Sequence, residues 1–188
     1  MKNFIGIYDS FVSKELCDKI IDFFEESPNK CEGRLHRPGM ITVDKEAKDS
    51  TDLLCNIHNV PFKKEMIRAS EITTQLYIAD FPECNNGLSP WEFDIEFNIQ
   101  RYLPNQGYFA PHCESGSLRT NHRVLAWMIY LNDVDDGGET RWISYDLNVK
   151  PKKGRVVIWP AFFTHIHHGL VSETETKYIA TGWYNYKD

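Results

Sequence analysis

The chain has 188 residues, 41% hydrophobic and 13% aromatic, which is enough apolar material for one compact domain. Its formal net charge of -6 argues against a broad nucleic-acid interface, which needs clustered lysine and arginine. The apolar runs are too short to cross a bilayer and the first residues lack a secretory signal, so we expect a cytoplasmic protein without a membrane partner. Five scattered cysteines without a CxxC pair predict free thiols.

The first part of the chain predicts a strand followed by an amphipathic helix. Residues 3–11 alternate between apolar and polar side chains, which is typical of a strand. Ser13 is a suitable N-cap for a helix over residues 14–26, which ends before Ser27 and Pro28. The apolar face of this helix is expected to contain Leu16, Ile20, Phe23 and Phe24.

A second helix is predicted over residues 62–80, directly after Pro61. The polar stretch before it, residues 28–52, predicts a loop with one short strand near 40–43. A turn-rich stretch follows the helix. The expected buried positions of this second helix are Ile67, Ile72, Leu76 and Tyr77.

The second half of the chain predicts many short strands. Turns separate the strands, and we interpret Asp135 to Gly138 as such a turn because two glycines explain it without a ligand. Helices followed by strands indicate a sandwich, barrel or jelly roll with helices outside one sheet. The predicted strands cover residues 91–102, 122–132, 154–160 and 177–186.

Two histidine-containing segments predict a metal site. In the segment APHCESG, His112 and Glu114 are two residues apart, so on a strand they share a face while Cys113 points the other way. The segment THIHHG, much further along the chain, contains three of the seven histidines. One of them can complete a set of two histidines and one carboxylate, which holds iron(II) in oxygenases and leaves adjacent positions open.

Four stretches around these histidines carry a family resemblance: IQRYLPNQGYFAPHCE, RVLAWMIYLNDVDDGGET, VKPKKGRVVIWPAFFTHIHHG and KYIATGWYNY. In this order they resemble the 2-oxoglutarate- and iron(II)-dependent dioxygenases, specifically the prolyl 4-hydroxylase-like branch. The segment YDSFVSKELCDKIIDFFEES is similar to the family's opening helix. The resemblance implies one mainly β domain over residues 1–188, with a helical part at about 1–90 packed on one sheet. A double-stranded β-helix, which is a jelly roll, is expected from about residue 91.

The resemblance also implies three metal ligands. His112 corresponds to the first histidine of the family's HxD motif, and Glu114 takes the carboxylate position, where many members have Asp. Glu is one methylene longer, but other members of the superfamily use it, so a working site is expected. Counting back from Lys177 at the family's usual spacing selects His167 as the distal histidine. His165, expected on the same strand face, is the alternative.

Further residues correspond to positions around the family's cosubstrate. Lys177 matches the basic residue that binds the distal carboxylate of 2-oxoglutarate, and a buried carboxylate needs such a cation. Tyr130 matches a tyrosine that shares this carboxylate, and Tyr102 matches a tyrosine of the same pocket. Trp183 matches a pocket-lining tryptophan. A plain core role is the alternative for these three aromatic residues, and His168 is expected to face away from the site.

The implied activity is hydroxylation of an unactivated C–H bond with Fe(II), 2-oxoglutarate and O2, and with ascorbate as a candidate accessory reductant. The resemblance favours a prolyl residue in a peptide or protein as the substrate. The irregular segment 31–51 could then form a flap over the site. The alternatives are a free amino acid or small molecule as substrate, a zinc-dependent hydrolase with the same ligands, and a non-catalytic binding module. The sequence does not predict an oligomeric state.

Overall fold

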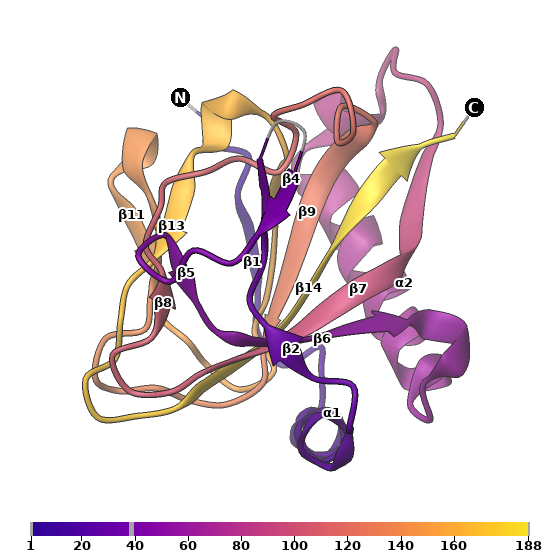
Figure 1. Ribbon diagram of the computed structural model, residues 1–188. Coiled ribbons are helices and arrows are strands. Elements are labelled where there is room, and N and C mark those ends of the chain that lie inside the picture. Colours follow the sequence, from indigo (N-terminus) through magenta and orange to yellow (C-terminus); the bar gives the residue numbers. More distant parts are fainter. Residues whose placement is uncertain (1, 38–39, 188) are drawn as a thin grey trace.

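The computed structural model describes residues 2–37 and 40–187, and it is mainly β with two α-helices (Figure 1). A seven-stranded antiparallel sheet with the order β1-β12-β9-β14-β7-β6-β2 forms its centre. The strands are β1 (Gly6–Tyr8), β2 (Cys31–Glu32), β6 (Thr51–Asn56), β7 (Trp91–Tyr102), β9 (Arg123–Tyr130), β12 (Val156–Pro160) and β14 (Lys177–Tyr186).

Smaller sheets lie on one side of this large sheet, and the helices lie on the other side (Figure 1). The three-stranded sheet has the order β11-β10-β13, and two further sheets are the pairs β3-β4 and β5-β8. Their strands are β3 (Leu35–Arg37), β4 (Met40–Thr42), β5 (Lys48–Asp49), β8 (Gly107–Tyr108), β10 (Thr140–Trp142), β11 (Leu147–Val149) and β13 (His167–Gly169).

The two α-helices are α1 (Lys14–Glu26) and α2 (Lys63–Asp80). Neither of them, nor any other helix of the described residues, combines the length and the apolar character that a membrane span requires. Short 3-10 helices connect the other elements: η1 (Ile57–Asn59), η2 (Pro82–Asn85), η3 (Ile143–Tyr145) and η4 (Phe163–His165).

Strand β9 shows why the large sheet can carry a core on each face. Successive side chains of a strand point to opposite faces, so Trp127 and Ile129 pack with the residues of α1 and α2. Met128 and Tyr130 pack on the other side, among residues of the three-stranded sheet. Because both faces are covered, β9 is a nearly continuous apolar run, in contrast to the alternating pattern of a half-exposed strand.

Helix α1 begins as the sequence predicts. The Ser13 hydroxyl accepts a hydrogen bond of 3.1 Å from the backbone N–H of Leu16, which has no partner within the helix. Three residues of the predicted apolar face are buried, and Phe23 is partly buried against Phe62, with ring centroids 5.4 Å apart. The three buried residues are Leu16, Ile20 and Phe24.

Replacement of Ser13 with Ala is expected to lower the free energy of unfolding by about 1 kcal/mol, because the N–H of Leu16 loses its acceptor. Chemical denaturation would measure this loss. Ser27→Ala is the matched control at the other end of α1, where the main-chain N–H of Ser27 makes the cap bond to Phe24. Equal losses in the two variants would contradict the assigned cap.

The predicted strands of the second half are present with small shifts of their ends, whereas the first half contains more β-structure than expected. Five short strands, β2 to β6, occupy or border the predicted loop over residues 28–52, and only β4 coincides with the expected strand. Residues 38–39 of the suggested flap lie outside the described residues. The prediction for Ile72 was wrong: its side chain is 39% exposed, because the buried face of α2 runs through Met66 and Thr73. All five cysteines are unpaired, as predicted.

Candidate active site

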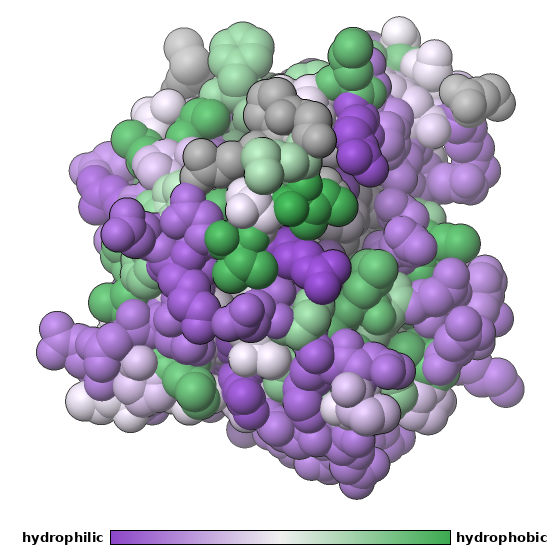
Figure 2. All heavy atoms as spheres, viewed as in Figure 1, coloured by the Kyte–Doolittle hydropathy of each residue, from purple (hydrophilic) through white to green (hydrophobic). Residues whose placement is uncertain are grey.

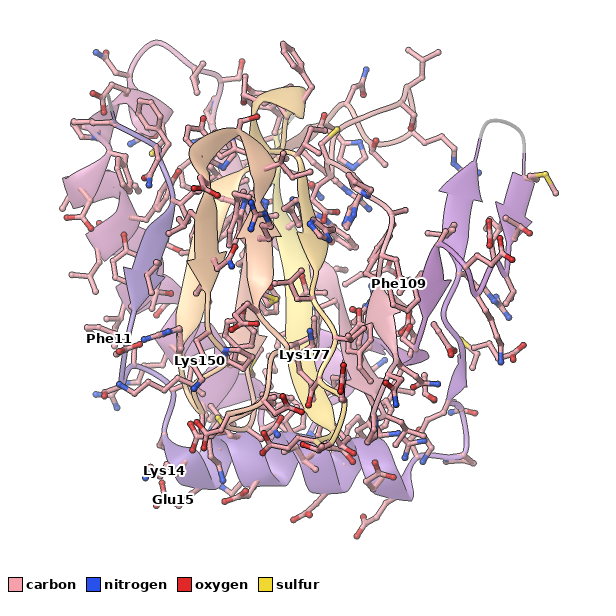
Figure 3. The ribbon with its side chains drawn as sticks, turned by 90° about the vertical axis from the view of Figure 1, so that its left-hand side faces the viewer. Phe11, Lys14, Glu15, Phe109, Lys150 and Lys177 are labelled. Atoms are coloured by element: carbon pink, nitrogen blue, oxygen red, sulfur yellow. The ribbon has the colours of Figure 1, made fainter. Side chains whose placement is uncertain are left out.

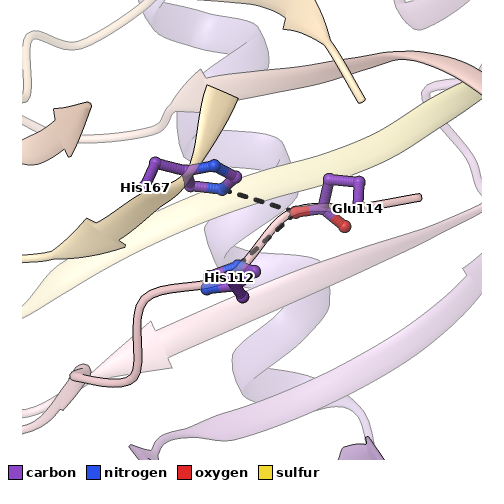
Figure 4. A group of neighbouring side chains, drawn as sticks. All are labelled: His112, Glu114 and His167. Carbon is purple, nitrogen blue, oxygen red and sulfur yellow. Dashed lines mark ion pairs between the residues drawn. The ribbon is translucent and has the colours of Figure 1, made fainter. Parts of the chain in front are cut away.

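His112, Glu114 and His167 lie together on the side of the large sheet away from the helices (Figures 1 and 4). One ligand atom from each residue lies within 4.8 Å of the other two. Glu114 Oε1 is 3.5 Å from Nε2 of His112 and 3.5 Å from Nε2 of His167. The structure therefore brings together the three residues that the sequence selected as ligands.

The main chain sets the positions of these residues. His112 and His167 form a single antiparallel bridge, in which each backbone N–H donates to the carbonyl of the other at 3.0 Å. The backbone N–H of Glu114 donates to Ala161 at 2.9 Å. The expected strand over residues 112–114 is thus reduced to this one bridge, but the two side chains still reach the same point.

Hydrogen bonds fix the tautomers of both rings. Nδ1 of His112 lies 3.0 Å from the carbonyl of Ala110, and Nδ1 of His167 lies 2.9 Å from the carbonyl of His165. A carbonyl only accepts, so both Nδ1 atoms carry protons and both Nε2 atoms present lone pairs to Glu114. Burial lowers the pKa of His167, which favours this neutral form of the ring.

The carboxylate of Glu114 uses its two oxygens differently. Oε1 faces the two histidines, whereas Oε2 accepts a hydrogen bond of 2.8 Å from Nε1 of Trp183. Burial would raise the pKa of Glu114, but the interactions of its carboxylate with His112 and His167 outweigh burial and hold the pKa well below its usual range. Glu114 is therefore ionised at neutral pH.

These residues fit a divalent cation. When both rings are neutral, two ring nitrogens and a carboxylate oxygen face one another as three acceptors. Such a convergence is unfavourable unless a cation lies between the three atoms. Two imidazoles and one carboxylate form the donor set typical of non-haem iron(II), with other positions left open.

The other two histidines of THIHHG do not join this group. His165 lies in η4 and is not on the strand with His167, so the expectation of a shared strand face was wrong. Its Nε2 donates to the carbonyl of Asn3 at 2.8 Å, and its ring packs against Tyr145 at 5.0 Å. His168 is paired in register with Arg141 on β10, next to His167 but on the other face of β13.

Lys177, at the start of β14, is a buried cation that forms no ion pair with a described residue. Lys177 is 5% exposed, and Figure 3 shows where it lies in the molecule. Nζ donates to the carbonyl of Gly138 at 2.9 Å. Burial lowers the pKa of Lys177 to about 8 against the opposing effect of the Glu139 charge. The ammonium is therefore suited to bind an anion.

The turn that contains Gly138 has the predicted form and an additional role. Gly137 and Gly138 have positive φ angles of 74° and 75°, which glycine adopts without strain. The carbonyl of Gly138 faces Lys177, so this turn helps to position the buried ammonium.

Strand β13 connects the histidine and lysine sites. Gly169 is two residues beyond His167, so the two positions face the same side. A Cβ atom built on Gly169 would lie 3.6 Å from Nζ of Lys177 and 3.5 Å from the backbone nitrogen of Tyr108. Because Gly169 has no side chain, none of its atoms fills the space next to the ammonium of Lys177.

The two predicted cosubstrate tyrosines are buried in the core that borders this space. The ring of Tyr102 lies 4.9 Å from Nζ of Lys177, and its hydroxyl donates to Gln100 at 2.7 Å. The hydroxyl of Tyr130 is directed to Thr140 Oγ1 at 2.7 Å and to the carbonyl of Val149 at 3.0 Å. These contacts place Tyr102 beside the ammonium and Tyr130 in the neighbouring hydrogen-bond network.

Sequence reasoning missed two side chains that contact the ligand residues. The ring of Tyr108 is stacked on His112 with centroids 3.7 Å apart, and the guanidinium of Arg123 lies 3.5 Å from the ring centroid of Trp183. Arg123 also donates to the backbone carbonyl of Glu114 at 3.2 Å. Tyr108 ends the two-residue strand β8 and Arg123 begins β9, so neither position carries a local motif that could have revealed it.

Residues 97–185 match the family model described as the 2OG-Fe(II) oxygenase superfamily. The matched segment is a little less than half of the chain. It contains His112, Glu114, His167 and Lys177, and the predicted resemblance to these iron(II)- and 2-oxoglutarate-dependent enzymes is confirmed.

Curated relatives of the chain include procollagen-lysine,2-oxoglutarate 5-dioxygenase 1 of Mus musculus. It is 33% identical over 97 residues, which is 49% of this chain and 12% of that much longer protein. The chain therefore corresponds to a small part of this relative.

Solved prolyl hydroxylases share the fold over nearly the whole chain. The collagen prolyl hydroxylase of Paramecium bursaria Chlorella virus-1, in complex with 2OG, has a TM-score of 0.70 and 20% identity, with 98% of this chain and 97% of that chain covered. A Trichoplax adhaerens prolyl hydroxylase, in complex with a peptide of the hypoxia inducible factor oxygen degradation domain, has a TM-score of 0.73 and 17% identity, with 98% and 84% covered.

Proposed function

We propose that this chain is a 2-oxoglutarate- and Fe(II)-dependent dioxygenase that hydroxylates an unactivated C–H bond. One observation carries the proposal: strand β13 passes both a site for a cation and a site for an anion. His167 of β13 supplies one of three acceptor atoms that need a cation, and Gly169 of β13 lies next to the buried ammonium of Lys177, which needs an anion. The match of residues 97–185 to the superfamily model supports it. When bound, ferrous iron would activate O2, which is the oxidant: one oxygen atom would enter the C–H bond, and the other would enter succinate as 2-oxoglutarate loses CO2.

The residues of the chain have distinct roles in this proposal. His112, Glu114 and His167 would hold the ion, and Lys177 would bind the distal carboxylate of 2-oxoglutarate. The bulky rings around the ligands limit the access of water: Tyr108 covers His112, while Trp142 and Trp159 pack against His167 with centroids 5.7 Å and 5.1 Å away.

A prolyl residue in a peptide or protein is the proposed substrate. The lysyl and prolyl hydroxylases among the relatives support this class. Exposed apolar side chains beside the site also support it: Leu118 is 91% exposed and Phe163 is 74% exposed. The segment that contains Leu118 meets the segment that contains Phe163 at Ala161, whose carbonyl accepts hydrogen bonds from the backbone N–H groups of Glu114 and Ser115. Figure 2 shows apolar side chains interspersed with polar ones in the upper part of the face it displays.

The large and small sheets, on this proposal, form the double-stranded β-helix of the superfamily, and residues 1–188 form a single domain. The fold shared with prolyl hydroxylases supports the first point. The packing of α1, α2 and the large sheet into one core supports the second. The five free cysteines support a cytoplasmic location, where thiols stay reduced.

Turnover of 2-oxoglutarate with proline-containing peptides tests the proposed function. We expect succinate release and a gain of one oxygen atom in the peptide, both dependent on Fe(II) and O2, with ascorbate tested as an added component. A zinc-dependent hydrolase would continue to act without O2. Oxygen-independent cleavage, or the absence of succinate with every substrate while the metal is bound, would contradict the proposal.

Gly169→Leu is expected to raise the KM for 2-oxoglutarate by about tenfold or more, because its side chain would occupy the space next to Lys177. Gly169→Ala is the matched control. Its Cβ would make ordinary contacts at 3.5 Å and 3.6 Å, so a change of less than about threefold is expected. Equal effects of the two substitutions would show that the space at Gly169 is not used by the cosubstrate.

The affinity for 2-oxoglutarate should fall as the pH rises above about 8. Burial lowers the pKa of Lys177 to about 8, so the free protein carries the charge below this pH and loses it above. A bound carboxylate favours the charged form, and linkage then predicts a loss of about tenfold in affinity for each pH unit above 8. Anaerobic titration of the metal-loaded protein measures this slope, which should disappear in Lys177→Met.

A further inference from the structure

The indole of Trp183 is hydrogen-bonded to the carboxylate of Glu114, which a tryptophan that only lines a pocket would not need. Nε1 of Trp183 donates to Oε2 of Glu114 at 2.8 Å, while Oε1 of the same carboxylate lies 3.5 Å from each histidine Nε2. Nη1 of Arg123 lies 3.7 Å from the same Oε2, so the hydrogen bond and this ion pair together hold Oε2 away from the point at which the three acceptors converge.

Two further features fix the indole in this position. The guanidinium of Arg123 is stacked on the ring of Trp183 at 3.5 Å from its centroid, and the same arginine donates to the backbone carbonyl of Glu114. Trp183 also lies where the pairing of β14 with β7 is irregular: Gly182 pairs with Phe97, whereas Tyr184 already pairs with Phe93. Such bulges redirect side chains, often next to functional sites.

Glutamate creates a problem that this hydrogen bond can solve. Its side chain is flexible, and carboxylates bind cations through one oxygen or through both. If both oxygens of Glu114 bound the ion, they would occupy a position that 2-oxoglutarate or O2 needs. A donor fixed on Oε2 removes this second mode of binding.

We propose that Trp183 is a positioning residue that restricts Glu114 to one metal-binding oxygen and so keeps a coordination position open. This inference rests on the metal site of the proposed function and extends it. Trp183→Phe removes the N–H but retains a ring for Arg123 to stack on. Because Trp183 is only partly buried, the variant is expected to fold.

Mn(II) provides a test that does not depend on turnover. Water-proton relaxation reports how many water molecules the bound Mn(II) holds, and we expect Trp183→Phe to lower the enhancement by about one third, because one of roughly three open positions is lost. The dissociation constant of 2-oxoglutarate, measured anaerobically with Fe(II), should rise by about tenfold. The shorter side chain in a Glu114→Asp background has less reach. Adding Trp183→Phe to this background should therefore change the relaxation enhancement and the dissociation constant of 2-oxoglutarate less than it does in the wild type.

Trp91→Phe is the matched control. Trp91 is partly buried like Trp183, but it packs on the helix side of the large sheet, and its Nε1 donates to the carbonyl of Cys84 at 3.0 Å. If both substitutions act alike, or if Trp183→Phe leaves relaxation and affinity unchanged, the proposal is overturned while the proposed function stands. If the wild-type protein binds Mn(II) but not 2-oxoglutarate, the proposed function is wrong. The relaxation measurement on Trp183→Phe then still tests whether Trp183 positions Glu114. Failure of the wild type to bind Mn(II) overturns both.

Discussion

Replacement of His167 with Ala is expected to abolish metal binding and turnover. His167 contributes one of two imidazole nitrogens that face Glu114, and the substitution removes this nitrogen together with the rest of the ring. Changes to groups that only support a ligand cost 10–100-fold in metal affinity, and loss of the ligand itself should exceed about 100-fold. Titration with Co(II), followed by its absorption spectrum, would measure this loss without the need for a substrate.

His165→Ala is the control for this experiment. His165 is buried like His167, but its Nε2 is engaged with the carbonyl of Asn3 and lies outside the ligand group. The variant should bind Co(II) with an affinity within about threefold of the wild type, although loss of two hydrogen bonds will lower its stability. Thermal unfolding of both variants separates metal loss from misfolding. Normal metal binding by His167→Ala together with loss in His165→Ala would reassign the ligand.

Lys177→Ala is expected to raise the 2-oxoglutarate requirement by about 100-fold or more. The ammonium is buried and forms no ion pair in the described part of the chain, so an entering carboxylate would make a desolvated ion pair with it. Removal of one member of such a pair costs about 3 kcal/mol or more, because the other charge is left buried without a partner. Anaerobic binding of 2-oxoglutarate to the Fe(II)-loaded protein measures the change directly.

Lys152→Ala provides a comparison for the Lys177 variant, because Lys152 is exposed and pairs only with Asp9 on the surface. It should bind 2-oxoglutarate like the wild type. Propylammonium added to Lys177→Ala should enter the vacated space and restore part of the binding. An unchanged 2-oxoglutarate requirement in Lys177→Ala would exclude this residue from the cosubstrate pocket.

Local patterns predicted the elements that have strong periodicity. The long alternation of residues 91–102 and the apolar run of residues 122–132 became β7 and β9, and Ser13 caps α1. The spacing of His112 and Glu114 was informative because side chains two residues apart can reach the same point. The choice of His167 over His165 depended on the family resemblance, since the histidine segment alone does not distinguish them.

Long-range pairing produced what the sequence did not predict. Strands β10 and β11 have three residues each, too few for a recognisable period, and they are stabilised by pairing with each other and with β13. His112 and Glu114 are placed by hydrogen bonds to His167 and Ala161 and do not lie in a regular strand. The contact between Trp183 and Glu114 joins residues whose separation in sequence carries no pattern.

The reciprocal backbone bonds between His112 and His167 have a consequence for the choice of metal. They align the two rings during folding, before an ion arrives, so most of the ordering required for chelation is complete in the empty protein. A rigid nitrogen pair of this kind holds later first-row metals more tightly than iron. Protein isolated from a nickel column or a zinc-rich medium should therefore carry the wrong ion, and iron loading in the cell would reflect supply more than selectivity.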